Sequence, residues 1–143
     1  MKIAVIGAVT WGIALSKFII KNNHDISIWV YFEELKNQLS KDRVLNTLPN
    51  VKIPDGILFT CDYAKVLSYV NIILIAVASP YIRTCISDMK KYISDNTIII
   101  CVDKGIEKET MKTMSEVIED ELNTKNINNI RIVALSGLLM LKK

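Results

Sequence analysis

The stretch "VIGAVTWG" (Val5–Gly12) decides the fold, because an apolar run leads there into a glycine turn and then into a helical pattern. A strand, a turn of the form G-x-G-x-x-G and a helix are the usual opening of a dinucleotide-binding fold. Gly7 and Gly12 occupy the first and third glycine positions, and Val9 occupies the second. The turn therefore keeps two of its three glycines, which by itself is weak evidence for phosphate binding.

Apolar runs and helical stretches alternate along the chain. We expect strands at 2–7, 24–30, 57–60, 71–79, 96–105 and 130–137. Helices are expected at 10–23, 32–40, 62–70, 80–93 and 109–123, the first with Ile13, Phe18 and Ile19 on its inner face. Residues 47–57 contain two prolines and a glycine and predict an irregular loop. The alternation predicts an α/β fold: one Rossmann-like, doubly wound, mainly parallel sheet with helices on both faces, forming a single domain over 1–143.

Composition and charge exclude several classes of function. Half of the 143 residues are hydrophobic and 23% are charged, which is typical of a folded globular chain. The net charge is +3 and the basic residues are scattered, so we expect no nucleic-acid partner. No apolar run is long enough for a membrane span. Because the chain enters a strand pattern directly, without a basic and apolar leader, we expect a cytoplasmic protein.

The cysteines, the single histidine and the acidic residues indicate no metal site. Cys61, Cys85 and Cys101 are widely spaced and form no C-x-x-C pair, which predicts reduced thiols in or near the core. His24 follows two asparagines and is predicted to be a turn residue. The acidic segment 115–122 predicts a solvated helix face.

Several motifs occur in an order that resembles one enzyme family. The first turn, Gly7-Ala8-Val9-Thr10-Trp11-Gly12-Ile13-Ala14, is similar to the pattern G-x-G-Ser/Asn-Trp/Tyr-G-Thr/Ser-A, in which the Trp is the most specific position. Further matching segments are "ISIWV" at 26–30, "LPNVKIPDGI" at 48–57, "ILIAVASPYIR" at 73–83, "DKGIE" at 103–107 and "ALSG" at 134–137. Together they resemble the N-terminal cofactor domain of NAD(P)-dependent glycerol-3-phosphate dehydrogenases.

The resemblance implies roles for individual residues. Those implied to surround the pyrophosphate and nicotinamide end of the cofactor are Gly7, Thr10, Trp11 and Gly12. Ser79 is implied to lie near the cofactor at the carboxyl edge of the sheet, and Gly137 in the substrate site. Lys104 is implied to contact both substrate and cofactor, where an ammonium can stabilise charge on the carbonyl oxygen as hydride moves.

Two residues of the cofactor site keep alternative interpretations. Thr10 is either the helix cap or a phosphate ligand. Tyr31 either stacks on adenine or packs the end of the second strand. No arginine follows that strand, whose continuation is Val30-Tyr31-Phe32-Glu33-Glu34, so we expect NAD to be preferred over NADP.

Two departures from the family limit the expected function. Val9 replaces a glycine, and the chain reads "LLMLKK" at 138–143 where the family continues with proline and a hydroxyl residue. The family's helical catalytic domain is expected to be absent, so this chain alone is expected to be inactive. Apolar residues 138–141 are expected to favour self-association.

The expected function is therefore that of the cofactor-binding half of an enzyme that transfers hydride between NAD(P)H and dihydroxyacetone phosphate or glycerol 3-phosphate. The alternative is a degenerate Rossmann-fold structural or interaction domain that binds no cofactor, which Val9 favours. A third hypothesis, a Rossmann oxidoreductase for keto acids or nucleotide sugars, is disfavoured by Trp11 and by the Lys104-Gly105 pair.

Overall fold

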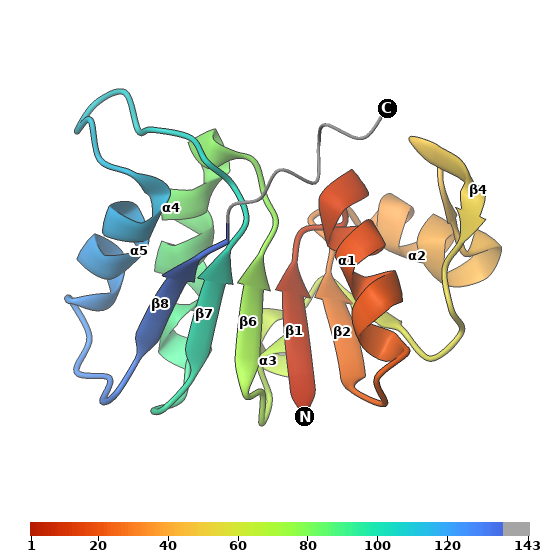
Figure 1. Ribbon diagram of the computed structural model, residues 1–143, viewed down its shortest axis with the longest axis horizontal. Coiled ribbons are helices and arrows are strands. Elements are labelled where there is room, and N and C mark those ends of the chain that lie inside the picture. Colours follow the sequence, from red (N-terminus) through yellow and green to blue (C-terminus); the bar gives the residue numbers. More distant parts are fainter. Residues whose placement is uncertain (136–143) are drawn as a thin grey trace.

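The computed structural model describes residues 1–135, and a six-stranded sheet lies at its centre (Figure 1). The strands follow the order β5-β2-β1-β6-β7-β8, and all five neighbouring pairs are parallel. Their bounds are β1 Lys2–Ile6, β2 Asp25–Trp29, β5 Leu58–Thr60, β6 Ile72–Ile75, β7 Ile98–Cys101 and β8 Arg131–Ala134. The chain reverses its direction of progress across the sheet between β1 and β6, which confirms the predicted doubly wound α/β fold.

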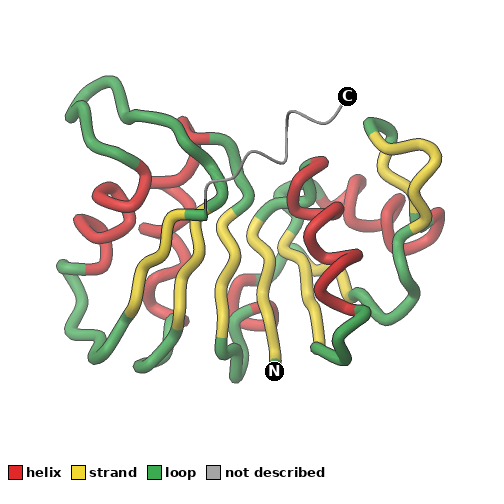
Figure 2. The backbone as a smooth tube through the Cα atoms, viewed as in Figure 1, coloured by secondary structure: helices red, strands yellow, loops and turns green. Residues whose placement is uncertain are grey.

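Helices cover both faces of the sheet, as Figure 2 shows. On one face, α1 (Thr10–Ile20) and α2 (Glu33–Asp42) bury Ile13 and Leu39 against one set of strand side chains. On the other face, α4 (Ser79–Met89) and α5 (Met114–Leu122) bury Ile82 and Ile118. The short α3 (Tyr63–Val66) adds Val66 to the core of this second face, and the 3-10 turn η1 (Lys90–Tyr92) directly follows α4. The central strands are apolar on both sides because helices pack on both.

The prediction of an irregular loop at 47–57 is wrong for its first half. Strands β3 (Val44–Leu45) and β4 (Leu48–Lys52) form an antiparallel hairpin with an irregular register. Pro49 is accommodated because a two-stranded ribbon consists only of edge strands, where a missing N–H breaks no central ladder. Arg43, in a left-handed conformation with φ of 56°, donates from Nη1 to the Ile57 carbonyl at 2.6 Å and joins the two ends of the hairpin segment.

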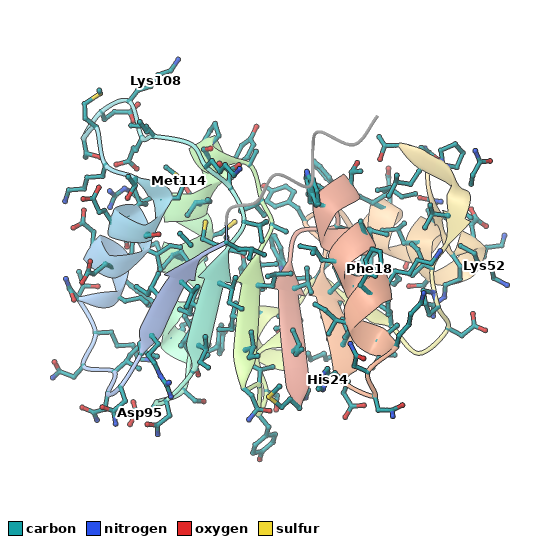
Figure 3. All side chains as sticks on the ribbon, viewed as in Figure 1. Phe18, His24, Lys52, Asp95, Lys108 and Met114 are labelled. Carbon is teal, nitrogen blue, oxygen red and sulfur yellow. The ribbon has the colours of Figure 1, made fainter. Side chains whose placement is uncertain are left out.

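Two further expectations are wrong in detail. Helix α5 begins at Met114 instead of residue 109, because Thr113 is its N-cap and forms a reciprocal capping box with Glu116. Phe18 is 68% exposed on α1 and does not join the core (Figure 3). It lies five positions after the buried Ile13, which places it about 140° round the helix at roughly 100° per residue.

Candidate functional site

The candidate site lies at the carboxyl edge of the sheet, the upper edge in Figure 1. Because all six strands are parallel, their carboxyl ends meet at this edge. The connections after β1 and β6 leave for opposite faces, so a crevice opens between two adjacent strands. The segments that meet there are the β1–α1 turn, the β6–α4 turn and the β7–α5 loop, residues 102–113. These segments hold most of the residues that the sequence predicts for the site.

The two glycines of the first turn are required by close contacts. Gly7 has a φ of 112°, and a Cβ there would lie 2.9 Å from Val77 Cγ1 and 3.0 Å from the backbone of Ala76. A Cβ on Gly12 would lie 2.4 Å from the Gly7 carbonyl oxygen. Gly7 therefore permits the tight turn beside β6, and Gly12 permits the close approach of α1 to that turn.

Val9 is the N-cap of α1, and its side chain is 46% exposed at the carboxyl edge. It has extended backbone angles, φ −91° and ψ 171°, and no side chain among residues 1–135 caps this helix. The interpretation of Thr10 as the cap is therefore wrong: Thr10 is the first helical residue, and its Oγ1 lies 2.8 Å from Oγ1 of Thr47 in the hairpin turn. The amide groups of the first turn remain available to an anion. Trp11, also in this turn, is 41% exposed.

The carboxylate of Asp103 links the start of α4, at Ser79, to the loop that carries Lys104. Asp103 Oδ1 accepts a hydrogen bond from Ser79 Oγ and another from the Gly105 amide at 2.7 Å. A Cβ on Gly105 would lie only 1.7 Å from Ser79 Oγ, so this position needs a glycine. Lys104 itself is exposed and forms no ion pair with any residue of the described part of the chain. Lys104 is thus an exposed residue of a loop that borders the crevice.

Tyr31 lies after β2 and is 73% exposed. Its ring contacts Trp29 at a centroid distance of 6.0 Å and Phe32 at 4.8 Å, both edge to face. It therefore packs the strand end and still presents a surface to solvent. Nearby, Glu33 pairs with Lys36, and the hydrogen bond from Lys36 lowers the pKa of Glu33. An ionised carboxylate at this strand end disfavours a ligand phosphate there.

Several other predicted features lie outside the crevice or outside the described residues. His24 lies between the turn 21–23 and β2, at the opposite edge of the sheet, with Nδ1 3.3 Å from the terminal amine (Figure 3). Cys61, Cys85 and Cys101 are free thiols, the last two buried. Gly137 and the apolar segment 138–141 lie outside the described residues. Within 1–135 the structure shows no cluster of metal-ligating side chains and no helix long and apolar enough to cross a membrane.

An open depression of about 670 Å³ lies elsewhere, between α3 and the region where α4 ends. Its walls include Tyr63, Asp88 and Tyr92, and it includes no residue of the glycine turn or of the Lys104 turn. None of the residues predicted to bind cofactor or substrate therefore lines this depression.

A group of ion pairs beside the crevice was not predicted from the sequence. The acidic segment 115–122 was expected to be a solvated face, but Glu121 is largely buried and pairs with Arg83 of α4 at 3.0 Å. Asp120 pairs with Lys112 at 2.5 Å, and Arg83 also binds Glu107 at 2.7 Å. Arg83 is separated from Glu107 by 24 positions and from Glu121 by 38, so the fold reveals these two pairs and the local sequence pattern does not.

Comparison with known proteins identifies the family. Residues 2–138 match the sequence model described as "NAD-dependent glycerol-3-phosphate dehydrogenase N-terminus". A glycerol-3-phosphate dehydrogenase (NAD(P)+) from Lactobacillus delbrueckii is 39% identical over 137 residues, which are 95% of this chain and 41% of the relative. One from Fusobacterium nucleatum is 38% identical over 96% of this chain and 40% of its own length.

Solved structures agree with this match. The crystal structure of glycerol-3-phosphate dehydrogenase from Coxiella burnetii superposes with a TM-score of 0.84 and 28% identity, over 95% of this chain and 40% of that one. The chain thus spans about two fifths of the length of the relatives it matches. It belongs to the family of NAD-dependent glycerol-3-phosphate dehydrogenases, in which it corresponds to the N-terminal part.

Proposed function

We propose that this chain binds NAD(H) across the crevice between β1 and β6, as the cofactor-binding half of a glycerol-3-phosphate dehydrogenase. The observation that carries the proposal is the geometry of the first turn. Gly7 makes the turn with a φ of 112°, and Gly12 brings α1 so close that a Cβ would lie 2.4 Å from the Gly7 oxygen. The uncapped start of α1 offers backbone N–H groups and the positive end of the helix dipole to a diphosphate that would bind in the crevice.

Residues around the crevice would then hold the different parts of the cofactor. The first-turn amides and the Thr10 hydroxyl bind the diphosphate, with Trp11 beside it. Tyr31 offers a ring face to adenine, and Glu33 favours NAD over NADP because a carboxylate repels a 2′-phosphate. Ser79 and Lys104 lie at the opposite side of the crevice, where the nicotinamide end would lie.

The reaction in which the chain would take part is hydride transfer between NAD(H) and the dihydroxyacetone phosphate and glycerol 3-phosphate pair. Bound cofactor supplies or accepts the hydride. Lys104 contributes an ammonium that attracts the substrate phosphate and stabilises negative charge on the carbonyl oxygen. We propose that turnover needs the part of the relatives that extends beyond the shared two fifths, because positioning the substrate requires a second wall.

The proposal includes a cytoplasmic location, where a diffusible cofactor and a small phosphorylated substrate meet. Self-association through 138–141 stays a prediction.

Val9 favours the second candidate function, a Rossmann-fold interaction domain without cofactor. Its branched side chain is 46% exposed beside the start of α1, where the fingerprint has a glycine to let phosphate approach.

A fluorescence titration with NADH separates the two candidates. We expect saturable binding by the unaltered chain and about three- to tenfold tighter binding by Val9→Gly, a gain of up to about 1.4 kcal/mol. Val133→Gly is the matched control, because Val133 in β8 is 45% exposed and lies outside the first turn. Binding by Val9→Gly alone would assign the natural chain to the second candidate. Absence of binding by both would refute the cofactor site.

A further inference from the structure

The turn that carries Lys104 is fastened to α4 at both of its ends. At one end, Asp103 accepts a hydrogen bond from Ser79, the first residue of α4. At the other end, Glu107 binds Arg83, one turn further along the same helix. Lys104 lies between the two fastened carboxylates and is exposed, without an ion pair to any residue in 1–135.

The attachment of Glu107 is bidentate. Arg83 donates from Nε to Oε2 and from Nη2 to Oε1, both at 2.7 Å, and Thr110 Oγ1 donates to Oε1 at 2.6 Å. Paired Arg–carboxylate bonds of this kind fix orientation as well as distance. The Glu107 backbone is also engaged, because its amide donates to the Lys112 carbonyl at 2.9 Å and its carbonyl accepts from the Met111 amide at 2.7 Å.

Arg83 is itself fixed by α5. Its Nη1 donates to Glu121 at 3.0 Å, and the Glu121 side chain is only 16% exposed. Lys90 approaches the other oxygen of Glu121 at 3.3 Å. The position of the Arg83 guanidinium is therefore set by α4 and α5, and its two hydrogen bonds to Glu107 fix that carboxylate in turn.

The attachment of Asp103 is equally tight. Its Oδ1 accepts hydrogen bonds from both Ser79 Oγ and the Gly105 amide. One oxygen of the residue before Lys104 therefore binds both α4 and the residue after Lys104. The close approach of Gly105 to Ser79 leaves no room for a side chain at Gly105. The backbone on both sides of Lys104 is thereby held against the start of α4, at the edge of the crevice.

We propose that Asp103 and Glu107 are positioning residues that hold the backbone of Lys104 at the edge of the crevice, from which its ammonium meets an anionic ligand. The proposal rests on the proposed NAD(H) function and goes beyond it by assigning these two carboxylates a purpose. A lysine on a loose loop loses both backbone and side-chain freedom when it binds a ligand, whereas a fastened loop has already lost the backbone share on folding. Neither carboxylate touches the ligand; each acts through Lys104.

A purely structural role for the ion pairs makes a different prediction. In that case removal of Glu107 would loosen the α4–α5 region, and its effect on binding would not depend on Lys104. A double-mutant cycle distinguishes the two roles, because coupled residues give non-additive effects. The cycle uses Glu107→Gln, which keeps the shape and removes the charge, together with Lys104→Ala.

The experiment measures the NADH dissociation constant for the unaltered 143-residue chain, both single variants and the double variant. We expect Glu107→Gln to weaken binding about three- to tenfold, and the double variant to bind as Lys104→Ala does. Glu109→Gln and Lys108→Ala are matched controls, because both side chains are exposed on the same loop and form no ion pair within the described residues (Figure 3 labels Lys108). Neither control should change the constant.

Amide hydrogen exchange without nucleotide provides a second, independent measurement. We expect faster exchange at residues 103–107 in Glu107→Gln than in Glu109→Gln. Equal exchange in the two variants would overturn the proposal, as would additive effects in a cycle where the unaltered chain binds NADH. If the unaltered chain binds no NADH, the proposed function itself fails, and the positioning role fails with it. The two failures are therefore distinguishable.

Discussion

The substitution Gly12→Ala tests the contact on which the proposed cofactor site depends. The added Cβ would lie 2.4 Å from the Gly7 carbonyl oxygen, and 3.3 Å from both Ala76 Cβ and Val5 Cγ1. The first of these atoms belongs to the backbone of the β1–α1 turn, so a change of side-chain rotamer cannot relieve the contact. Either α1 moves away from β1 or the Gly7 turn is displaced.

The expected loss of stability follows from two opposing effects. Overpacking of this kind is destabilising by about 1–3 kcal/mol, and the backbone contact favours the upper part of that range. Alanine is a better helix former than glycine by at most about 1 kcal/mol, which offsets part of the loss. The net loss is about 1–2 kcal/mol. With about 2.1 cal/mol/K of unfolding entropy per residue over 143 residues, the Tm should fall by about 3–7 °C.

Thermal unfolding followed by circular dichroism measures this shift. Gly56→Ala is the matched control, because a Cβ there meets only the flexible end of Ile20, at 3.2 Å. Its Tm should change by less than that of Gly12→Ala. NADH binding should be lost or strongly weakened in Gly12→Ala, since the first turn of α1 is displaced. An unchanged or raised Tm would refute the argument, because helix propensity would then outweigh the contact.

Two more predictions concern the β7–α5 loop and α5. Thr113→Ala removes the capping box with Glu116 and should lower the free energy of unfolding by about 1 kcal/mol; a urea midpoint that does not move would contradict this. The hydrogen bond from Arg83, with a further one from Thr110, lowers the pKa of Glu107 from 4.5 to about 2. Because the folded pKa is the lower one, the stabilisation is present above pH 4.5 and is lost as the pH falls toward 2. Glu107→Gln should therefore lose less Tm than the unaltered chain over this interval, and equal losses would contradict the assignment.

The sequence predicted the parallel sheet and most of the crevice because their signals are local. Residues 72–78 are apolar at consecutive positions, and a run this short is typical of a strand buried on both faces. At Gly7 and Gly12 a Cβ would collide with neighbouring backbone atoms, so the two glycines in the sequence directly indicate this tight turn. The family motif then placed Ser79 and Lys104 at the same edge, where the fold brings their turns together.

The features that the sequence did not predict depend on contacts between distant segments. Arg83 and Glu121 lie on different helices, and the packing of α4 on α5 pairs them, so the acidic pattern of α5 alone resembles a solvated face. The β3–β4 hairpin has few β-branched residues and contains Pro49, which local propensity assigns to a loop. Contacts with other elements hold the hairpin in place; for example, Gln38 of α2 donates a hydrogen bond to the Val44 carbonyl at 2.9 Å.

Val9 shows why the departure from the glycine fingerprint leaves the fold intact. Glycine is essential in a turn where φ is positive or where a Cβ would collide, and both conditions hold at Gly7. At Val9 neither holds: φ is −91°, and the side chain is 46% exposed at the end of the helix. The valine therefore introduces no backbone strain, and its effect is confined to the space above the first turn of α1. Gly7 and Gly12 are thus required by the backbone geometry of the turn, whereas Val9 meets no such requirement, and we expect its substitution to change cofactor affinity without changing the fold.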